Sequence, residues 1–253
     1  MSAPLLAAHD LRKRFGGVVA TDGVTLAVAA GEVHALIGPN GAGKTTLVAQ
    51  LSGGLVPDSG RIQFAGRDAT LMGQSERVRM GLARSYQITT IFGTFSVLEN
   101  LALAVQARSG SSMSFWRPVS REAALFDEAR SLAGRIGLAG REPVPAAHLA
   151  HGEQRALEVG LALATRPRLL LLDEPMAGMG PEESERMIAL IQSLRASDPG
   201  LAVLLIEHDM DAVFRLADRI SVLVSGRVVA SGSPSEIRAD AQVRKAYLGE
   251  ETA

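Results

Sequence analysis

GPNGAGKTT, residues 38–46, decides the fold of this chain because it joins a buried strand to a helix through a glycine-rich turn. The apolar run Val33–Ile37 precedes it, and the helix-like run Thr46–Leu51 follows it. A glycine, four residues and then Gly-Lys-Thr is the spacing of a phosphate-binding loop. Glycines let successive N–H groups turn toward phosphate oxygens, and the following helix begins with a partial positive charge. The sequence therefore predicts a nucleoside triphosphate site at this turn.

Two side chains of the turn have distinct predicted roles. Lys44 is expected to neutralise the terminal phosphates, and the Thr45 hydroxyl is expected to help hold Mg²⁺. Lys44 is one of only three lysines among 26 basic residues, in a chain that otherwise uses arginine. The candidate nucleotide contacts are Gly38, Pro39, Asn40, Gly41, Ala42, Gly43, Lys44, Thr45 and Thr46.

The composition excludes several classes of protein. The 253 residues include 47% hydrophobic residues, which is ample for a core, and the net charge of −1 gives no long-range field for nucleic acid. Without cysteine there is neither a disulfide framework nor a thiolate metal site. The N-terminus does not resemble a signal peptide, and no apolar run approaches the ~18 residues of a membrane span. Any link to a membrane is therefore expected to come through a partner.

The hydrophobic pattern of the chain changes from strand-like to helical at about residue 88, and the core pattern resumes at about residue 149. Strand-like runs at Val24–Val28 and Arg61–Phe64 accompany the phosphate loop, whereas Val97–Arg108 and Arg121–Ile136 have helical spacing, with the linker-like Ser109–Ser114 between them. We interpret residues 88–148 as a helical lobe inserted into an α/β core that comprises residues 1–87 and 149–253.

The second part of the core has the pattern of a parallel sheet. Leu169–Leu172 and Leu201–Ile206 are apolar runs typical of strands buried on both faces, and Glu182–Ala196 between them is an amphipathic helix. A strand, a helix and a strand at this length predict parallel pairing. A hairpin around residues 225–226 and a capping box from Ser233 to Glu236 follow.

Two carboxylates follow the Leu169–Leu172 strand directly. The carboxyl end of a parallel strand is where ligands bind in open α/β sheets. Asp173 is expected to hold Mg²⁺, and Glu174, which points elsewhere, is the candidate general base for an attacking water.

Two further side chains are candidates for the same site. His208 follows the strand Leu201–Ile206 and could reach a terminal phosphate or orient the water. Gln87 lies where the core meets the helical lobe, and its amide could contact Mg²⁺-bound water and respond to the γ-phosphate.

Together these motifs resemble the ATP-binding subunits of ABC transporters over nearly the full length. They occur in the family's order and are GPNGAGKTT, Gln87 in GLARSYQ, LAHGEQR (Leu149–Arg155), LLLLDEP and IEHD around His208. Five sequence segments are similar to those of one branch of the family, the ATPases of branched-chain (hydrophobic) amino-acid uptake systems. They are RFGG, LAHGEQRALEVG, DEPMAGM, IEHDM and YLGE.

The resemblance implies an α/β P-loop NTPase core with a mainly parallel sheet, an N-terminal antiparallel β subdomain and the inserted helical lobe. It implies ATP and Mg²⁺, and a head-to-tail dimer with an identical or paralogous ATPase. Leu149, Ala150, His151, Gly152 and Glu153 of each subunit would then contact ATP on the partner's phosphate loop. It also implies two membrane-spanning permeases, a binding protein outside the membrane, and a peripheral location on its cytoplasmic face.

This chain departs from the family's commonest pattern at several positions. Ala150 replaces the signature serine, His151 the first signature glycine, and Gly180 an aspartate in the loop after DEP. The aromatic residue expected to stack on adenine is Phe15 instead of tyrosine.

Some alternatives remain open on the sequence alone. Ile88–Asn100 either receives the permease's coupling helix or packs the lobe onto the core. The substrate could be another small molecule, and a soluble ABC-type mechanical ATPase or a P-loop kinase are competing functions. The Gln87, LAHGEQR and His208 set argues against the kinase.

Overall fold

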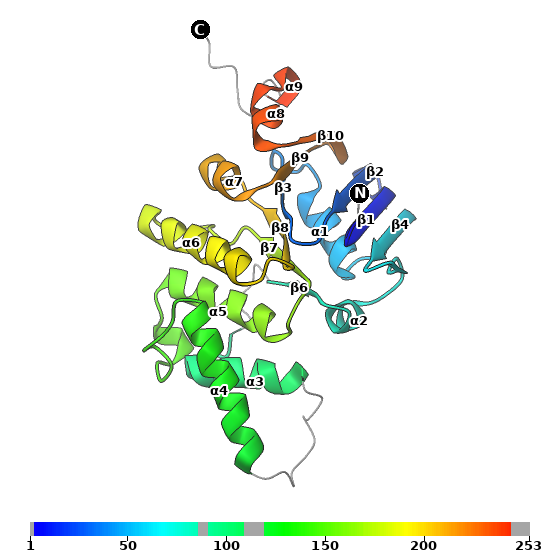
Figure 1. Ribbon diagram of the computed structural model, residues 1–253. Coiled ribbons are helices and arrows are strands. Elements are labelled where there is room, and N and C mark those ends of the chain that lie inside the picture. Colours follow the sequence, from blue (N-terminus) through cyan, green and yellow to red (C-terminus); the bar gives the residue numbers. More distant parts are fainter. Residues whose placement is uncertain (1–2, 86–90, 109–118, 244–253) are drawn as a thin grey trace.

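The computed structural model describes residues 3–85, 91–108 and 119–243, which form two sheets and a helical lobe (Figure 1). The larger sheet has the strand order β10-β9-β3-β8-β7-β6, and its neighbours from β9 to β6 all pair in parallel. Its strands are β3 (Val33–Ile37), β6 (Leu82–Arg84), β7 (Leu169–Asp173), β8 (Ala202–Ile206), β9 (Arg219–Val224) and β10 (Arg227–Gly232). The predicted strands at Val33–Ile37, Leu169–Leu172 and Leu201–Ile206 are confirmed, as is their parallel arrangement.

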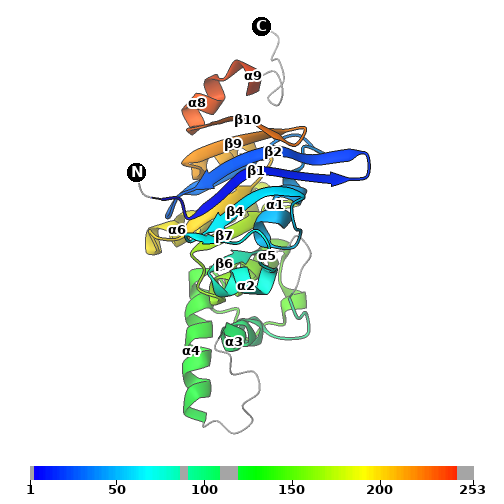
Figure 2. The same ribbon diagram turned by 90° about the vertical axis from the view of Figure 1, so that its right-hand side faces the viewer.

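A second sheet is antiparallel, with the order β2-β1-β4-β5. Figure 2 shows its long strands side by side near α1 (Lys44–Ser52). The strands are β1 (Leu6–Phe15), β2 (Val18–Val28), β4 (Ser59–Phe64) and β5 (Arg67–Asp68). The predicted strands Val24–Val28 and Arg61–Phe64 lie within β2 and β4. The two sheets and the helices between their strands form the α/β fold that the sequence predicted.

The helical lobe contains α3 (Val97–Arg108) and α4 (Val119–Arg135), at the lower end of Figure 1, and α5 (His151–Ala164), with which the second part of the core begins, packs against both. Arg108 ties the three together, because its guanidinium donates to both Glu128 oxygens of α4 at 2.8 Å and to the carbonyl of Ala164 at 2.7 Å. Both predicted helices of the lobe are confirmed. The predicted linker Ser109–Ser114 lies outside the described residues.

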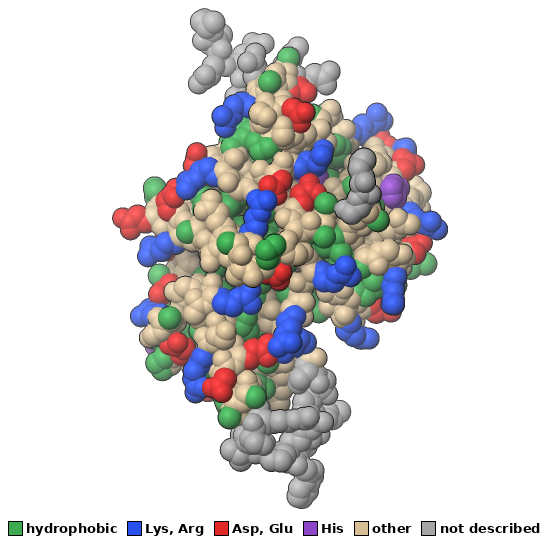
Figure 3. All heavy atoms as spheres, viewed as in Figure 1, with side chains coloured by type: hydrophobic (Ala, Val, Ile, Leu, Met, Phe, Trp, Pro, Cys, Tyr) green, Lys and Arg blue, Asp and Glu red, His purple; other side chains and the backbone are tan. Residues whose placement is uncertain are grey.

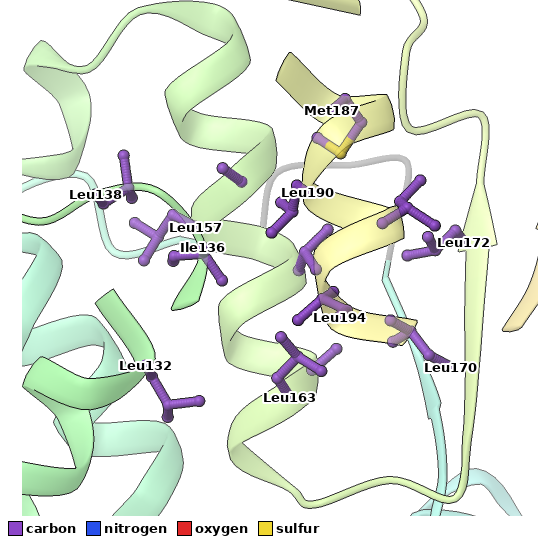
Figure 4. Packing of buried hydrophobic residues seen from close by; sticks show 14 of the residues in the cluster. Leu132, Ile136, Leu138, Leu157, Leu163, Leu170, Leu172, Met187, Leu190 and Leu194 are labelled. Atoms are coloured by element: carbon purple, nitrogen blue, oxygen red, sulfur yellow. The ribbon is translucent and has the colours of Figure 1, made fainter. Parts of the chain in front are cut away.

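Strand β7 is buried on both faces, which explains its unbroken leucine run. Leu170 and Leu172 belong to the cluster that joins α5 to α6 (Pro181–Ser197), as Figure 4 shows. Leu169 and Leu171 face the opposite cluster, which contains α1 and the antiparallel sheet. A strand with apolar neighbours on both faces has no polar positions to alternate.

Several short elements complete the fold. They are α2 (Gln74–Arg79), the 3₁₀ turn Ala146–His148, α7 (Met210–Leu216), α8 (Pro234–Ala239) and α9 (Ala241–Val243). The capping box is confirmed, because the Ser233 N–H donates to Glu236 Oε2 at 2.7 Å and the Glu236 N–H to Ser233 Oγ at 3.3 Å. In the described part of the chain, no helix is long and apolar enough to cross a membrane.

Candidate nucleotide site

Four adjacent parallel strands deliver the predicted site to one edge of the sheet. These strands are neighbours in the order β3, β8, β7, β6. The phosphate loop follows β3, Glu207 and His208 follow β8, Asp173 ends β7 just before Glu174, and Ser85 follows β6. Because the carboxyl ends of parallel strands meet at the same edge, motifs far apart in the sequence become neighbours. Gln87 follows β6 but lies outside the described residues.

The phosphate loop requires glycine at two positions for steric reasons. Gly38 has a φ of 155° and Gly43 a φ of 103°. A Cβ on Gly38 would lie 2.1 Å from the carbonyl oxygen of Leu223, and a Cβ on Gly43 2.1 Å from that of Ala20. The loop therefore packs directly against neighbouring backbone, and Gly43 forms the N-terminal cap of α1.

Lys44 folds back over the loop that precedes it. Its Nζ donates to the carbonyl of Gly38 at 2.6 Å and to that of Pro39 at 3.1 Å. Burial lowers the pKa of Lys44, while the negative charges of Glu174 and Asp173 act in the opposite direction. The ammonium group thus lies within electrostatic reach of both carboxylates.

Asp173 has a cationic partner that the sequence analysis missed. Nη2 of Arg84, at the end of β6, donates to Oδ2 of Asp173 at 2.7 Å; the Asp173 side chain is 5% exposed and that of Arg84 13%. Strands β6 and β7 are neighbours, with Arg84 paired to Leu171, so the register places the two side chains together. The sequence shows a basic residue, the arginine in GLARSYQ, shortly before Gln87, but only the pairing of the strands reveals its partner.

The donor set suits Mg²⁺ carried by a nucleotide. Asp173 supplies a carboxylate oxygen, and the exposed Thr45 supplies a hydroxyl in the first turn of α1. Among the described residues no cluster of three His, Cys, Asp or Glu side chains could hold a metal ion. Mg²⁺ in NTPases takes few protein ligands and several phosphate or water oxygens, so two oxygen donors beside a phosphate loop fit it.

Glu174 has a backbone conformation that is unusual for its residue type. Its φ is 50°, in the left-handed region, which costs roughly 1–3 kcal/mol for a residue other than glycine. The Glu174 N–H donates to the carbonyl of Ile206 in β8 at 2.9 Å. The chain therefore turns sharply after Asp173.

His208 is exposed, whereas the residue before it is not. The His208 side chain is 63% exposed and the Glu207 side chain 1%. The Glu207 carboxylate accepts the His208 N–H at 3.1 Å and the Met176 N–H at 2.9 Å. Asp209 then caps α7 by accepting the N–H groups of Asp211 and Ala212.

The LAHGEQR element opens α5 at the boundary between the lobe and α6. Ala150 is the N-cap, and the Glu153 carboxylate accepts its N–H at 2.9 Å. The Gly152 N–H donates to Oε1 of Glu183 in α6 at 3.0 Å, and Nε2 of His151 donates to the carbonyl of Ala177 at 3.2 Å. Leu149, just before the helix, is buried.

Phe15 lies at the end of β1 with 51% of its surface exposed, so it is not a core residue. The Lys13 Nζ lies 5.8 Å from the centre of its ring.

On the face shown in Figure 3, basic and acidic side chains are interspersed.

A phosphate loop and two carboxylates at the edge of a parallel sheet define a P-loop nucleoside triphosphatase. The ABC transporter profile matches residues 21–177, and that of the branched-chain amino acid ATP-binding cassette transporters matches residues 227–253. The chain therefore belongs to the ABC transporter family, as the resemblance predicted.

Two curated relatives align over almost the whole chain. It is 40% identical to the high-affinity branched-chain amino acid transport ATP-binding protein LivG of Salmonella typhimurium, with 99% of this chain and 100% of the relative covered. It is 38% identical to the corresponding BraF protein of Pseudomonas aeruginosa, with the same coverage. The crystal structure of an ABC transporter ATP-binding cassette in its ADP conformation superposes with a TM-score of 0.85 at 28% identity, covering 98% of this chain and 100% of that one.

Proposed function

We propose that this chain is the ATP-binding and ATP-hydrolysing subunit of an importer for branched-chain or other hydrophobic amino acids. The observation that carries the ATPase is the meeting of Lys44, Asp173 and Glu174 at one sheet edge. The substrate class is supported by the match of residues 227–253 and by the named relatives. The chain would lie on the cytoplasmic face of the membrane, bound to two permease subunits that a binding protein supplies with substrate.

Each side chain has a role in the proposed reaction with ATP. The loop amides and Lys44 bind the β- and γ-phosphates, and Phe15 stacks on adenine. Thr45, Asp173 and Gln87 would hold Mg²⁺, which would supply positive charge to offset that of the phosphate oxygens. Glu174 accepts the proton of the attacking water, and His208 contacts the γ-phosphate.

The active site in this proposal is composite. The chain has one copy of each motif, and its residues 149–153 open α5, whose positive N-terminal end would face the phosphates held by a partner subunit. Two subunits therefore dock head to tail, so that Leu149 to Glu153 of one contact the ATP held by Lys44 of the other. ATP binding favours the dimer and hydrolysis releases it, which is a ligand-biased two-state switch.

Residues 91–100 are the proposed contact with the permease. Phe92 and Phe95 are 54% and 41% exposed, with ring centres 5.3 Å apart. The buried Asn100 holds this turn, since its amide donates to the carbonyls of Phe92, Phe95 and Ser96. Because the two aromatic side chains are exposed, they do not serve mainly to pack the lobe, and an apolar helix face of the permease would cover them.

The decisive experiment replaces the base and leaves the phosphate loop intact. Glu174→Gln should bind ATP with affinity close to that of the unchanged protein, lose turnover by at least about 100-fold and accumulate as an ATP-dependent dimer. ATPase rates and sedimentation velocity measure the two effects. Lys44→Ala is the matched comparison and should lose nucleotide binding. Near-normal hydrolysis by Glu174→Gln would remove Glu174 as the base.

The substrate class and the membrane location need a separate test. The chain should sediment with membranes only when its permeases are co-expressed, and the purified complex in liposomes should take up leucine, isoleucine or valine with ATP. Transport of an unrelated solute instead would favour the alternative substrate, and a stable soluble assembly would favour a mechanical ATPase.

A further inference from the structure

Glu207 is a buried carboxylate that none of the roles above uses. Its side chain is 1% exposed, and burial raises its pKa. Within the described residues its one ion-pair contact is with the exposed His208 ring, 3.8 Å away. A carboxylate held without a close Lys or Arg carries a large desolvation cost, so its hydrogen bonds must hold it in place.

Those hydrogen bonds come from two different loops of the site. Oε1 accepts the N–H of Met176 at 2.9 Å, in the turn that follows β7. Oε2 accepts the N–H of His208 at 3.1 Å, in the segment that follows β8, and the backbone of Asp209 also donates to the carboxylate. One side chain therefore fastens the loop of the proposed base to the loop of the proposed phosphate-contacting histidine.

The first two amides of the turn after β7 are both bound by the segment that ends β8. Glu174 is strained, with a φ of 50°, and such a conformation persists only where its surroundings hold it. Its own N–H is bound by Ile206 of β8. Pro175 has no N–H, so Met176 supplies the next amide, and Glu207 takes it. Glu174 is thus held on both sides by consecutive residues of one neighbouring segment, Ile206 and Glu207.

We propose that Glu207 is a positioning residue, whose carboxylate sets the orientation of Glu174 relative to His208 by bridging the amides of Met176 and His208. This inference rests on the proposed ATPase function, and it adds a residue that touches neither nucleotide nor Mg²⁺. The same turn contacts the LAHGEQR element through Ala177 and His151, so Glu207 also supports the side of the site that faces a second subunit.

Glu207→Gln tests the bridge with almost no change in volume. The amide nitrogen of glutamine is a donor, so it faces at least one of the backbone donors and cannot replace that hydrogen bond. We expect kcat to fall at least about tenfold, because misplacing a base by a fraction of an ångström has effects of this size. KM for ATP and the dissociation constant of ATP should stay within about twofold, since the phosphate loop is untouched.

Glu32→Gln is the matched control. Glu32 also accepts a backbone N–H, that of Ala29 at 2.6 Å, but it precedes β3 and so lies at the opposite edge of the same sheet. The substitution Glu32→Gln should reduce thermal stability without changing kcat. If Glu207→Gln and Glu32→Gln lose stability to a similar extent and both keep kcat, Glu207 is structural only and the proposal fails.

Hydrogen exchange on the unchanged protein covers the case in which Glu207→Gln does not fold. The Met176 amide lies in a turn, outside any helix or strand, and the buried carboxylate that accepts it should slow its exchange at least about 100-fold. Rapid exchange at Met176 would overturn the proposal. Absence of ATP hydrolysis by the unchanged protein would instead refute the proposed function, so the two failures are distinguishable.

Discussion

The buried pair between Arg84 and Asp173 makes a quantitative prediction about stability. Arg84→Gln removes the guanidinium but leaves a carboxylate that is 5% exposed. Breaking a buried ion pair on one side typically costs about 3–5 kcal/mol. The lower end, about 3 kcal/mol, is expected because the charges of Lys44 and Asp173 attract each other and Lys44 remains. For a chain of this size that corresponds to a fall in Tm of roughly 6–12 °C.

A double-mutant cycle measures the pair itself. Arg84→Gln, Asp173→Asn and the double variant are unfolded by heat and by urea, with no nucleotide present. The double variant should be more stable than the sum of the single effects predicts, by about 1–3 kcal/mol. Arg130→Gln is the control, because its pair with Asp127 is exposed on both sides and should contribute less than about 1 kcal/mol. A coupling close to zero for Arg84 and Asp173 would refute the reasoning.

Three further predictions concern the phosphate loop, the signature element and the lobe. Gly43→Ala should abolish nucleotide binding in fluorescence titrations, because its Cβ would overlap a backbone carbonyl. Gly41 also has a positive φ, 78°, but open space around it, so Gly41→Ala should lose only about 1 kcal/mol of stability. Ala150→Ser should leave turnover within about threefold, because the Glu153 carboxylate already caps the helix by accepting the Ala150 N–H, and a gain beyond about tenfold would show that the missing hydroxyl limits the enzyme. The hydrogen bond from Arg108 holds the pKa of Glu128 below its ordinary value of 4.5. Its stabilising effect is therefore present above that value and lost as the pH falls through the lowered one, so Glu128→Gln should flatten the acid side of a stability profile measured by urea unfolding.

The local patterns of the sequence predicted much of the fold. Val33–Ile37, Val97–Arg108 and the long helix of the lobe were recognised because each spans enough residues for its hydrophobic period to be read. The N-terminal strand β1 was not delimited, because its residues from His9 onward, with Asp10 and a run of basic residues, show no clear alternation. Its pairing with β2 and β4 holds it in the sheet regardless of that pattern.

The candidate site was predicted wherever a motif lies within a few consecutive residues. Lys44, Asp173, Glu174 and His208 were named because strand ends and glycine spacing are local signals. Arg84 was missed as the partner of Asp173 because 89 residues separate them, and only the pairing of β6 with β7 brings them together. The roles assigned to these residues, and the role of Gln87, remain predictions.

The sequence by itself determined the class of protein, since the glycine turn, the leucine strand with its two carboxylates and their order along the chain are properties of short segments. Only the tertiary structure decided which groups hold those segments in place. Glu207 and Glu183 look like ordinary surface acids in the sequence, yet one is buried between two loops and the other accepts the N–H of Gly152. Burial and hydrogen-bond partners depend on which strands and helices become neighbours, and no local pattern specifies that.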